Sequence, residues 1–552
     1  MNTPKCDCSE SVWNWLAPVL VLSSMILSLA VCAYFHTGFY ASDDISYLDT
    51  IFALSKGERF EAGLGNVRLP LLLIPALVFR LSGGSIFLTT FVGNLYPPLI
   101  VLMTYLLGTY VQNRKVGAIA SGFVALSPLT YCFSGGLLPD NALTFWMMVW
   151  CVFLVRSFSC EEADGGEVQS FRFHYVFLAG LANGIAYLTK ESGLILAVPA
   201  GIALLSTKPL LSWPFASKQK WKALILYGFG LGACFVLELL VLRIWTGHFV
   251  YRLGIATNTE WLPHLLQRMQ EQGTNPWDRI LFAFNLVSLL TGKLILLLGF
   301  GAALIYPLLK GKFRILPLVP IWLFSYHTLG SVSFSQYVTP VIVNRYYIIV
   351  IPFLSICFAA VAFQLLSWSL RAVAFWLKHE STRTIFAELS ATGIIVIFGL
   401  YVGYERALAT EYYYAGKMYR GAEVKAFLTA LGIAQKEYPE LPIVLSYYTS
   451  SRMYPLWGNE CPRQDIYFLR HRENCNKRTK PEPPLIFLSI NNTNFDAPPE
   501  EAITKLVDPS RFRIPSAPRL IPAPGSRFQE IRQRNFEALD LPPDADLLGD
   551  PS

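Results

Sequence analysis

Two adjacent acidic residues, Asp43 and Asp44, follow the first long apolar segment of the chain, and Tyr47 lies three residues further on. A hydrophobic core does not need such a pair, and a loop at a membrane surface tolerates it. At the mouth of a helical bundle, a carboxylate pair beside an aromatic residue suits a general base or an ion-pair partner. Taken alone, the pair is better explained as a solvated loop, so its meaning depends on the rest of the chain.

Other polar residues stand at the ends of apolar segments: Arg68, Asp140, Lys190, Glu191, Arg345, Tyr346 and Tyr347. Each has a simpler explanation. Asp140 suits the N-terminus of a helix, Lys190-Glu191 an interfacial ion pair, and Arg345 a headgroup anchor. If all lie at one membrane level, they describe a cleft in which three cations suit the phosphate of a lipid and a carboxylate faces an acceptor hydroxyl or amine.

The composition predicts the elements that must position these residues. Of the 552 residues, 53% are hydrophobic and only 15% are charged, and the mean hydropathy is +0.41. Soluble domains carry about 25% charged residues, so the chain is predicted to be an α-helical polytopic membrane protein. About eleven transmembrane helices are predicted, near residues 15–35, 86–111, 116–133, 138–156, 174–189, 193–206, 221–242, 281–309, 315–330, 345–368 and 385–406.

The loops set the topology. Basic residues gather near 114–115, 208–222, 310–314 and 371–383, which places those loops in the cytoplasm and accounts for the net charge of +7 without nucleic-acid binding. The first helix is interpreted as an uncleaved signal anchor. The loop with Asp43 and Asp44 and the C-terminal region then lie outside. The short apolar segment 68–81 is predicted to be a juxtamembrane helix on the outer surface.

Three parts are predicted along the chain. Residues 1–408 form the transmembrane domain, with a first external loop over 36–85. Residues 409–515 form a small extracytoplasmic α/β domain with helices at 421–434 and 499–507 and strands at 442–447 and 485–490. Residues 516–552 form a Pro-rich flexible tail.

Six segments in order resemble the integral-membrane GT-C glycosyltransferases, in particular the branch with the lipid A aminoarabinose transferase and the protein O-mannosyltransferases. They are Ser42-Asp43-Asp44-Ile45-Ser46-Tyr47, Asn66-Val67-Arg68-Leu69-Pro70, Ala125-Leu126-Ser127-Pro128, Leu138-Pro139-Asp140-Asn141, Gly184-Ile185-Ala186-Tyr187-Leu188-Thr189-Lys190 and Arg345-Tyr346-Tyr347-Ile348-Ile349-Val350-Ile351-Pro352. The resemblance spans roughly residues 15–370. The chain departs from the family pattern at Asp44, where the family has Glu, and at Glu191-Ser192, where it has Gly.

The resemblance implies an inverting transfer of a sugar from a polyprenyl-phosphate-linked donor to a lipid, glycan or protein acceptor on the extracytoplasmic side. Asp43 is then the general base, and Asp44 orients the acceptor or a cation. Arg68, Lys190 and Arg345 bind the donor phosphate, and Tyr47, Asp140, Glu191 and Tyr346 complete the substrate site. No metal is expected to be required, although a divalent cation is left open, and the expected location is a bacterial cytoplasmic membrane with the site on its outer face.

Two other classes of function remain open. A transporter or lipid-linked-sugar flippase would need polar residues through the middle of the membrane, where the chain offers Glu238 and Lys293. A binding or scaffold protein would act through the C-terminal part. ATP-driven transport is disfavoured because the chain has no GxxxxGK[ST] loop.

Overall fold

The computed structural model describes most of the helical part of the chain and a few segments beyond it. The described residues are 8–36, 44–58, 67–135, 137–163, 166–205, 218–247, 249, 252, 272, 275–309, 316–331, 339–376, 380–415, 420–445, 466–468, 485–488 and 503–506. They divide into two compact units. Unit 1 comprises Met1–His36, Arg59–Pro75 and Phe91–Thr410, and unit 2 comprises Thr37–Glu58, Ala76–Thr90 and Glu411–Ser552.

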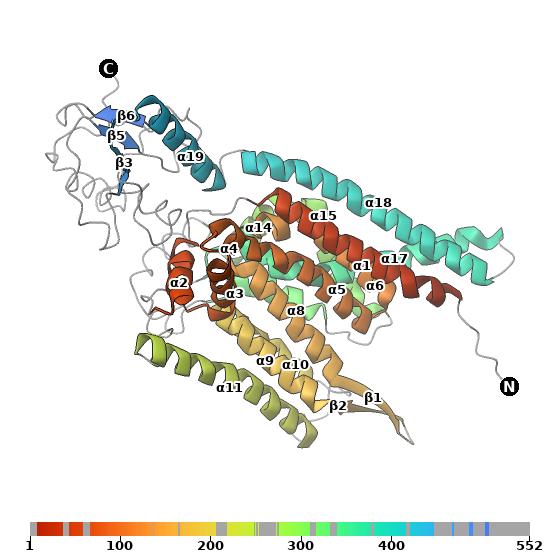
Figure 1. Ribbon diagram of the computed structural model, residues 1–552. Coiled ribbons are helices and arrows are strands. Elements are labelled where there is room, and N and C mark those ends of the chain that lie inside the picture. The colour runs from red at the N-terminus through yellow and green to blue at the C-terminus, as the bar shows by residue number, and fades with distance from the viewer. Residues whose placement is uncertain are drawn as a thin grey trace. The chain divides into compact units, whose positions relative to one another are not determined.

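Unit 1 is helical (Figure 1), and helix occupies every segment in which one of the eleven predicted helices was placed. Its elements are α1 (Cys8–Tyr34), η1 (Val92–Leu95), α5 (Tyr96–Val111), α6 (Arg114–Ala125), α7 (Pro128–Cys132), α8 (Pro139–Ser157), α9 (Phe173–Thr189), η2 (Glu191–Leu196), α10 (Ala197–Leu205), α11 (Lys218–Thr246), α14 (Pro276–Thr291), α15 (Lys293–Ile305), η5 (Tyr306–Leu308), α16 (Leu318–Leu329), η6 (Asn344–Val350), α17 (Ile351–Val373), η7 (Ala374–Trp376) and most of α18 (Glu380–Ala415). Two further helices, α3 (Leu69–Leu81) and α4 (Ile86–Phe91), each have residues assigned to both units.

Several of these helices are long and apolar enough to cross a bilayer, which identifies an integral membrane protein. Among the described residues, five candidate spans meet this standard: Val12–Tyr34, Ile86–Val111, Lys218–Trp245, Asn344–Trp376 and Thr382–Ala407. A bent pair, Pro276–Thr291 with Lys293–Leu308, would make a sixth. The larger number of about eleven spans stays a prediction, since α8, α9 and the shorter apolar helices do not meet this standard by themselves.

The segment 281–309, predicted as a single span, is instead two helices that meet at an angle of 114°. Gly292 stands between them with φ at +85°, a left-handed conformation that glycine adopts without steric cost. Lys293 is the first residue of α15 and is exposed. The break therefore removes the lysine from the middle of a continuous apolar helix.

Close packing of α9 against α11 depends on three glycines. A Cβ atom added at Gly180 would lie 2.1 Å from the carbonyl oxygen of Tyr227, and one at Gly230 would lie 2.3 Å from that of Phe177. At Gly184 it would lie 2.5 Å from Cβ of Cys234. Small residues four apart allow this approach between membrane helices, and Figure 1 shows the two helices side by side.

A short hairpin joins α8 to α9. Its strands β1 (Phe158–Ala163) and β2 (Gly166–Phe171) pair antiparallel, with Phe158 opposite Phe171. The sequence predicts no strand between the helices at 138–156 and 174–189. The hairpin fixes where α9 begins, two residues after β2 ends.

Unit 2 contains α2 (Asp44–Lys56), α19 (Arg420–Glu437) and a four-stranded sheet. The strands β3 (Ile443–Leu445), β4 (Ile466–Phe468), β5 (Leu485–Leu488) and β6 (Ile503–Leu506) have the order β4-β3-β5-β6. Strand β3 pairs parallel with β4 and β5, whereas β6 pairs antiparallel with β5.

The predicted helix at 421–434 lies within α19, but the helix predicted at 499–507 is wrong, because Ile503–Leu506 is strand β6. Two β-branched residues, Ile503 and Thr504, favour an extended conformation there, and β5 offers them an edge. The division of the chain into domains ending at 408 and 515 stays a prediction.

Candidate functional site

The turn after α9 positions two of the predicted site residues. Lys190 ends α9 in an extended conformation, and Glu191 begins η2. Gly193 is required in this turn, since a Cβ there would lie 2.3 Å from the carbonyl carbon of Ala186. The amide of Gly193 donates to the carbonyl oxygen of Lys190 over 2.8 Å, and Asn183 Nδ2 donates to the Gly193 carbonyl over 2.7 Å. The far end of the turn is therefore held by Asn183 of the helix that precedes it.

A buried chain of hydrogen bonds fixes Asn183 in turn. Tyr227 Oη, from α11, donates to Asn183 Oδ1 over 2.5 Å. Trp150 Nε1, from α8, donates to Tyr227 Oη over 3.0 Å. These hydrogen bonds thus fix the turn with Lys190 relative to α8, α9 and α11. Such a network keeps a charged side chain in one place.

Asp140 joins two of the predicted cations. It lies in the first turn of α8 and is 1% exposed, so its carboxylate needs partners. Lys190 Nζ lies 2.5 Å from Oδ1, and Arg345 Nε lies 3.5 Å from Oδ2. Lys190 Nζ also lies 3.6 Å from the centre of the Tyr346 ring, a cation–π contact. The structure therefore brings Asp140, Lys190, Arg345 and Tyr346 together, as their positions at helix ends predict.

Arg252 is a central residue that the sequence analysis missed. It is buried, and its Nη2 donates to the carbonyl oxygens of Val67 over 2.8 Å and of Leu188 over 3.1 Å. Its Nε lies 2.6 Å from Glu238 Oε1, and its Nη1 lies 2.7 Å from Glu191 Oε1. One guanidinium therefore joins the segment before α3, the turn after α9 and helix α11.

Glu191 links Arg252 to Arg68. Its Oε2 lies 3.2 Å from Arg68 Nη2, and about a third of its side chain is exposed. Burial raises the pKa of this carboxyl, but the guanidinium groups of Arg68 and Arg252 outweigh burial and hold the pKa below its ordinary value of 4.5. Glu191 therefore stays ionised at neutral pH between two arginines.

Arg279, a buried residue of α14, helps to hold the segment that carries Arg345 and Tyr346. Arg279 Nε donates to the Thr328 carbonyl over 2.9 Å, and Nη2 donates to the Pro340 carbonyl over 2.8 Å. The hydroxyls of Thr328 and Tyr347 lie 3.0 Å apart. These bonds tie η6 and the residues just before it to α14 and α16.

The acidic pair is less fully described. Asp43 lies outside the described residues, Asp44 is the first residue of α2, and Tyr47 is buried within that helix. These residues belong to unit 2, whereas the cluster of Asp140, Lys190, Glu191, Arg252, Arg345 and Arg68 belongs to unit 1. We refer to those six residues with Glu238 as the charged cluster. It holds four cations and three carboxylates, which leaves one net positive charge.

Metal ligands of a familiar kind do not gather in the described part of the chain. There, no three His, Cys, Asp or Glu side chains are close enough to hold a metal ion. His248 and His264 lie outside the described residues, as does Asp43. Whether the protein needs a divalent cation therefore stays a prediction.

Comparison with known proteins identifies the fold. No protein-family model matches the chain, and no curated protein matches it in sequence. Among solved structures, ArnT from Cupriavidus metallidurans bound to undecaprenyl phosphate matches with a TM-score of 0.51 and 14% identity, over 82% of this chain and 86% of that one. The same protein in its apo state matches with a TM-score of 0.51 and 13% identity, over 87% and 93% of the two chains.

A third match, to the oligosaccharyltransferase of Archaeoglobus fulgidus, has a TM-score of 0.42 and 14% identity over 79% of this chain and 62% of that one. That score is too low to establish a shared fold. ArnT is an aminoarabinose transferase of the GT-C fold. The chain therefore has the GT-C fold of ArnT, which confirms the fold implied by its sequence motifs.

Proposed function

We propose that the protein is an inverting membrane glycosyltransferase that moves a sugar from a polyprenyl-phosphate-linked donor to a lipid, glycan or protein acceptor on the extracytoplasmic side. The observation that carries this proposal is the placement of Lys190 and Arg345 around Asp140. The GT-C fold supports it, since a solved neighbour with that fold holds undecaprenyl phosphate.

The charged cluster suits the departing lipid phosphate. Asp140 orients Lys190 and Arg345, and the Arg345 side chain is 21% exposed, so its guanidinium is within reach of a ligand. The phosphodiester of the donor carries one negative charge, and the phosphate that leaves carries a second. Oriented cations stabilise this developing charge more than they stabilise the bound donor, which lowers the barrier.

The transfer step balances with one base. An oxygen or nitrogen of the acceptor attacks the anomeric carbon from the face opposite the phosphate. The bond between the anomeric carbon and the phosphate oxygen breaks, and the oxygen keeps the bonding pair. The acceptor proton passes to the carboxylate of Asp43, with Asp44 and Tyr47 beside it in sequence. A single displacement of this kind inverts the sugar carbon.

An alternative reading of the charged cluster is that it only holds helices together. The chain offers a matched control for this, because Lys115 pairs with Glu388 over 2.6 Å and both side chains are largely buried. The predicted topology places that pair near the cytoplasmic side. Loss of either lysine leaves a buried carboxylate, but only Lys190 belongs to the proposed phosphate site.

Binding of undecaprenyl phosphate and dolichyl phosphate to the purified protein in detergent, measured by native mass spectrometry, separates the two readings. We expect Lys190→Met to weaken binding of at least one of these lipids by about tenfold or more, as loss of a charge-assisted hydrogen bond predicts. Lys115→Met should leave binding unchanged. Equal binding by wild type and Lys190→Met would show that the cluster is structural.

The catalytic assignment is tested separately by mass spectrometry of envelope lipids and glycans from cells with and without the protein. A sugar-bearing product should appear with the wild type and be lost with Asp43→Asn. If Asp43→Asn gives the wild-type amount of product, Asp43 is not the base. If the protein leaves lipids and glycans unchanged but moves a lipid-linked sugar across the membrane, it is a flippase and not a transferase.

A further inference from the structure

Glu191 is the most exposed carboxylate of the charged cluster. Its side chain is 32% exposed, whereas the side chains of Asp140 and Glu238 are 2% and 4% exposed. It also stands where the glycosyltransferase motif that this chain resembles has glycine. An acid at this position adds a negative charge, open to solvent, to a site proposed to bind phosphate.

Arg252 anchors one oxygen of this carboxylate. Its Nη1 lies 2.7 Å from Glu191 Oε1, and its side chain is 5% exposed. The acceptors around its guanidinium are Glu191, Glu238 and the carbonyl oxygens of Val67, Tyr187 and Leu188. A guanidinium has five N–H groups, so each of them has an acceptor within the protein. Arg252 therefore serves to hold Glu191 in place.

The second oxygen of Glu191 is held less tightly. Its Oε2 accepts from Arg68 Nη2 over 3.2 Å, which is longer than the contact with Arg252. Lys190, the preceding residue, also acts electrostatically on this carboxylate. Arg68 and Lys190 are two of the three cations expected to bind the donor phosphate. Glu191 thus takes up, in the absence of lipid, a hydrogen bond that a phosphate oxygen is equally suited to accept.

We propose that Glu191 competes with the lipid phosphate for Arg68 and so favours release of the lipid phosphate after sugar transfer, an inference that rests on the proposed function. The phosphodiester of the donor carries one negative charge, and the phosphate monoester left after transfer carries a second. Like charges at close range repel each other. Glu191 therefore weakens binding of the product more than it weakens binding of the donor.

A purely structural role for Glu191 makes the opposite prediction. If the carboxylate only joins Arg68 to Arg252, its loss leaves Arg68 less well positioned, and the lipid phosphate binds more weakly. If the carboxylate competes for Arg68, its loss makes the same lipid bind more tightly. The direction of the change in affinity therefore separates the two roles.

Native mass spectrometry of the full chain in detergent measures this direction, with undecaprenyl phosphate and its methyl ester as probes. The methyl ester is a phosphodiester with one negative charge. In Glu191→Gln, the amide oxygen still accepts from Arg252, but the charge is gone. We expect this variant to bind undecaprenyl phosphate about tenfold more tightly than wild type and the methyl ester about threefold more tightly, because half the charge gives half the effect on a logarithmic scale.

Release is measured directly by a chase with deuterated undecaprenyl phosphate. The bound lipid should leave Glu191→Gln about tenfold more slowly than it leaves the wild type, since most changes in affinity at one site appear in the dissociation rate. A second variant, Glu191→Asp, covers the case in which the first does not fold. It keeps the charge beside Arg252 but reaches less far toward Arg68, so its affinity for undecaprenyl phosphate should rise about threefold.

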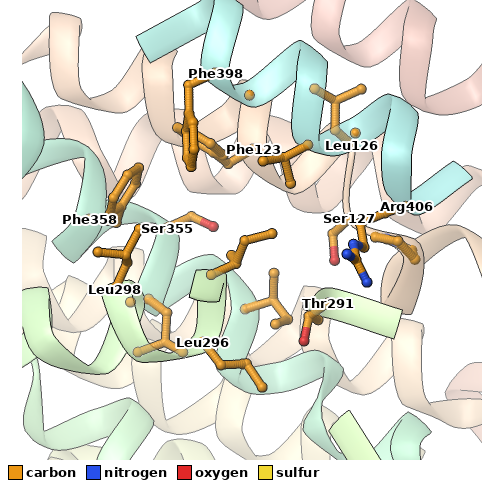
Figure 2. Close-up of a pocket in the computed structure, with 18 residues that line it drawn as sticks. Phe123, Leu126, Ser127, Thr291, Leu296, Leu298, Ser355, Phe358, Phe398 and Arg406 are labelled. Atoms are coloured by element: carbon orange, nitrogen blue, oxygen red, sulfur yellow. The ribbon is translucent and has the colours of Figure 1, made fainter. Parts of the chain in front are cut away.

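A general effect of charge at the outer surface is controlled by Glu405→Gln. Glu405 is exposed on α18, and the predicted topology places it on the same side of the membrane. Its neighbour Arg406 lines a separate pocket, to which no residue of the charged cluster contributes (Figure 2). Glu405→Gln makes the same change in net charge and should bind both lipids as wild type does.

A second control removes a carboxylate that is likewise held between two cations. Glu388 lies 2.6 Å from Lys115 Nζ and 3.5 Å from Arg371 Nη2, near the predicted cytoplasmic side. Glu388→Gln should leave the affinity for both lipids unchanged. A gain in affinity equal to that of Glu191→Gln, in either control, would overturn the proposal.

The remaining outcomes distinguish this inference from the proposed function. If wild type binds neither lipid, both are wrong. If wild type binds undecaprenyl phosphate and Lys190→Met weakens that binding, the phosphate site stands. Equal or weaker binding by Glu191→Gln would then overturn the competition alone, as would an equal gain for the two lipids.

Discussion

Asp140 carries a charge that almost no solvent reaches, between the ammonium of Lys190 and the guanidinium of Arg345. A buried ion pair adds little net stability, yet removing one partner is costly because the other charge loses its compensation. Replacing one charged residue of the cluster should therefore reduce stability by more than the complete cluster contributes to it.

We predict that Asp140→Asn lowers the free energy of unfolding by about 3 kcal/mol. The asparagine keeps the shape of the side chain but leaves Lys190, whose side chain is 10% exposed, without its closest carboxylate. Unfolding in detergent followed by intrinsic fluorescence measures the change. The control Glu380→Gln, at an exposed position that begins α18, should change stability by no more than about 0.5 kcal/mol. Equal stability of the two variants would contradict the prediction.

The lowered pKa of Glu191 predicts the effect of acid. A carboxyl whose pKa is lower in the folded state stabilises the fold fully above the ordinary value of 4.5, and this contribution is lost as the pH falls through the lowered pKa. Glu191→Gln should therefore be less stable than wild type near neutral pH and should lose less stability on acidification below 4.5. Thermal unfolding across this range measures both effects, and parallel pH curves for the two proteins would contradict the prediction.

At this scale, residue types at helix ends were enough to predict that Asp140, Lys190, Arg345 and Tyr346 meet. They were not enough to find Arg252. Two of its partners are the carbonyl oxygens of Val67 and Leu188, and a backbone acceptor leaves no mark in the sequence. The one available signal was Glu238, an acid within an apolar helix that requires a cation.

Among the helices, contact between α9 and α11 depends on the absence of side chains at a few positions. Two glycines of this pair of helices make a matched comparison. A Cβ at Gly180 would lie 2.1 Å from the Tyr227 carbonyl oxygen, whereas a Cβ at Gly228 would meet nothing within 4 Å.

We predict that Gly180→Ala destabilises the protein by about 1–3 kcal/mol, because the helices must separate and the hydrogen bond between Tyr227 and Asn183 is disturbed. Gly228→Ala should be neutral or stabilising by up to about 1 kcal/mol, since alanine favours helix. Thermal unfolding in one detergent compares the variants. A loss of stability in both would show that helix packing at Gly180 is not the cause.

The eleven helical segments could be placed from apolar runs, because each run is long and ends at polar residues. The break at Gly292 could not be placed in this way, since the left-handed conformation of one glycine interrupts an unbroken apolar pattern. Strand β6 was mistaken for helix because its pairing with β5 is a distant contact. Local pattern determines helices well, and it determines neither bends nor strand partners.

For the molecule as a whole, the distribution of basic loops predicts which ends of the helices face outward. In a background with Cys6, Cys8, Cys160, Cys461 and Cys475 replaced by serine, a membrane-impermeant maleimide should label Lys293→Cys and Arg243→Cys on intact cells. Arg114→Cys and Lys218→Cys should be labelled only after the membrane is opened. All four positions are exposed in the structure. Labelling of Arg114→Cys on intact cells would show that the predicted topology is wrong.

The GT-C fold was predicted from ordered motifs at helix ends, and the match to ArnT, at only 14% identity, supports that prediction. The number of membrane crossings was not predictable in the same way, since apolar helices such as α10 and α16 are too short to count as spans by themselves.

The near-balance of charge in the cluster has a consequence for inhibitors. Each arginine or lysine there already has a carboxylate within 3.5 Å, so a small ion from solution has to displace an internal partner to gain a contact. Inorganic phosphate and pyrophosphate, which bring no hydrocarbon, should therefore compete weakly at millimolar levels. An anion delivered by the bilayer avoids this disadvantage, because its tail supplies the affinity that its headgroup lacks.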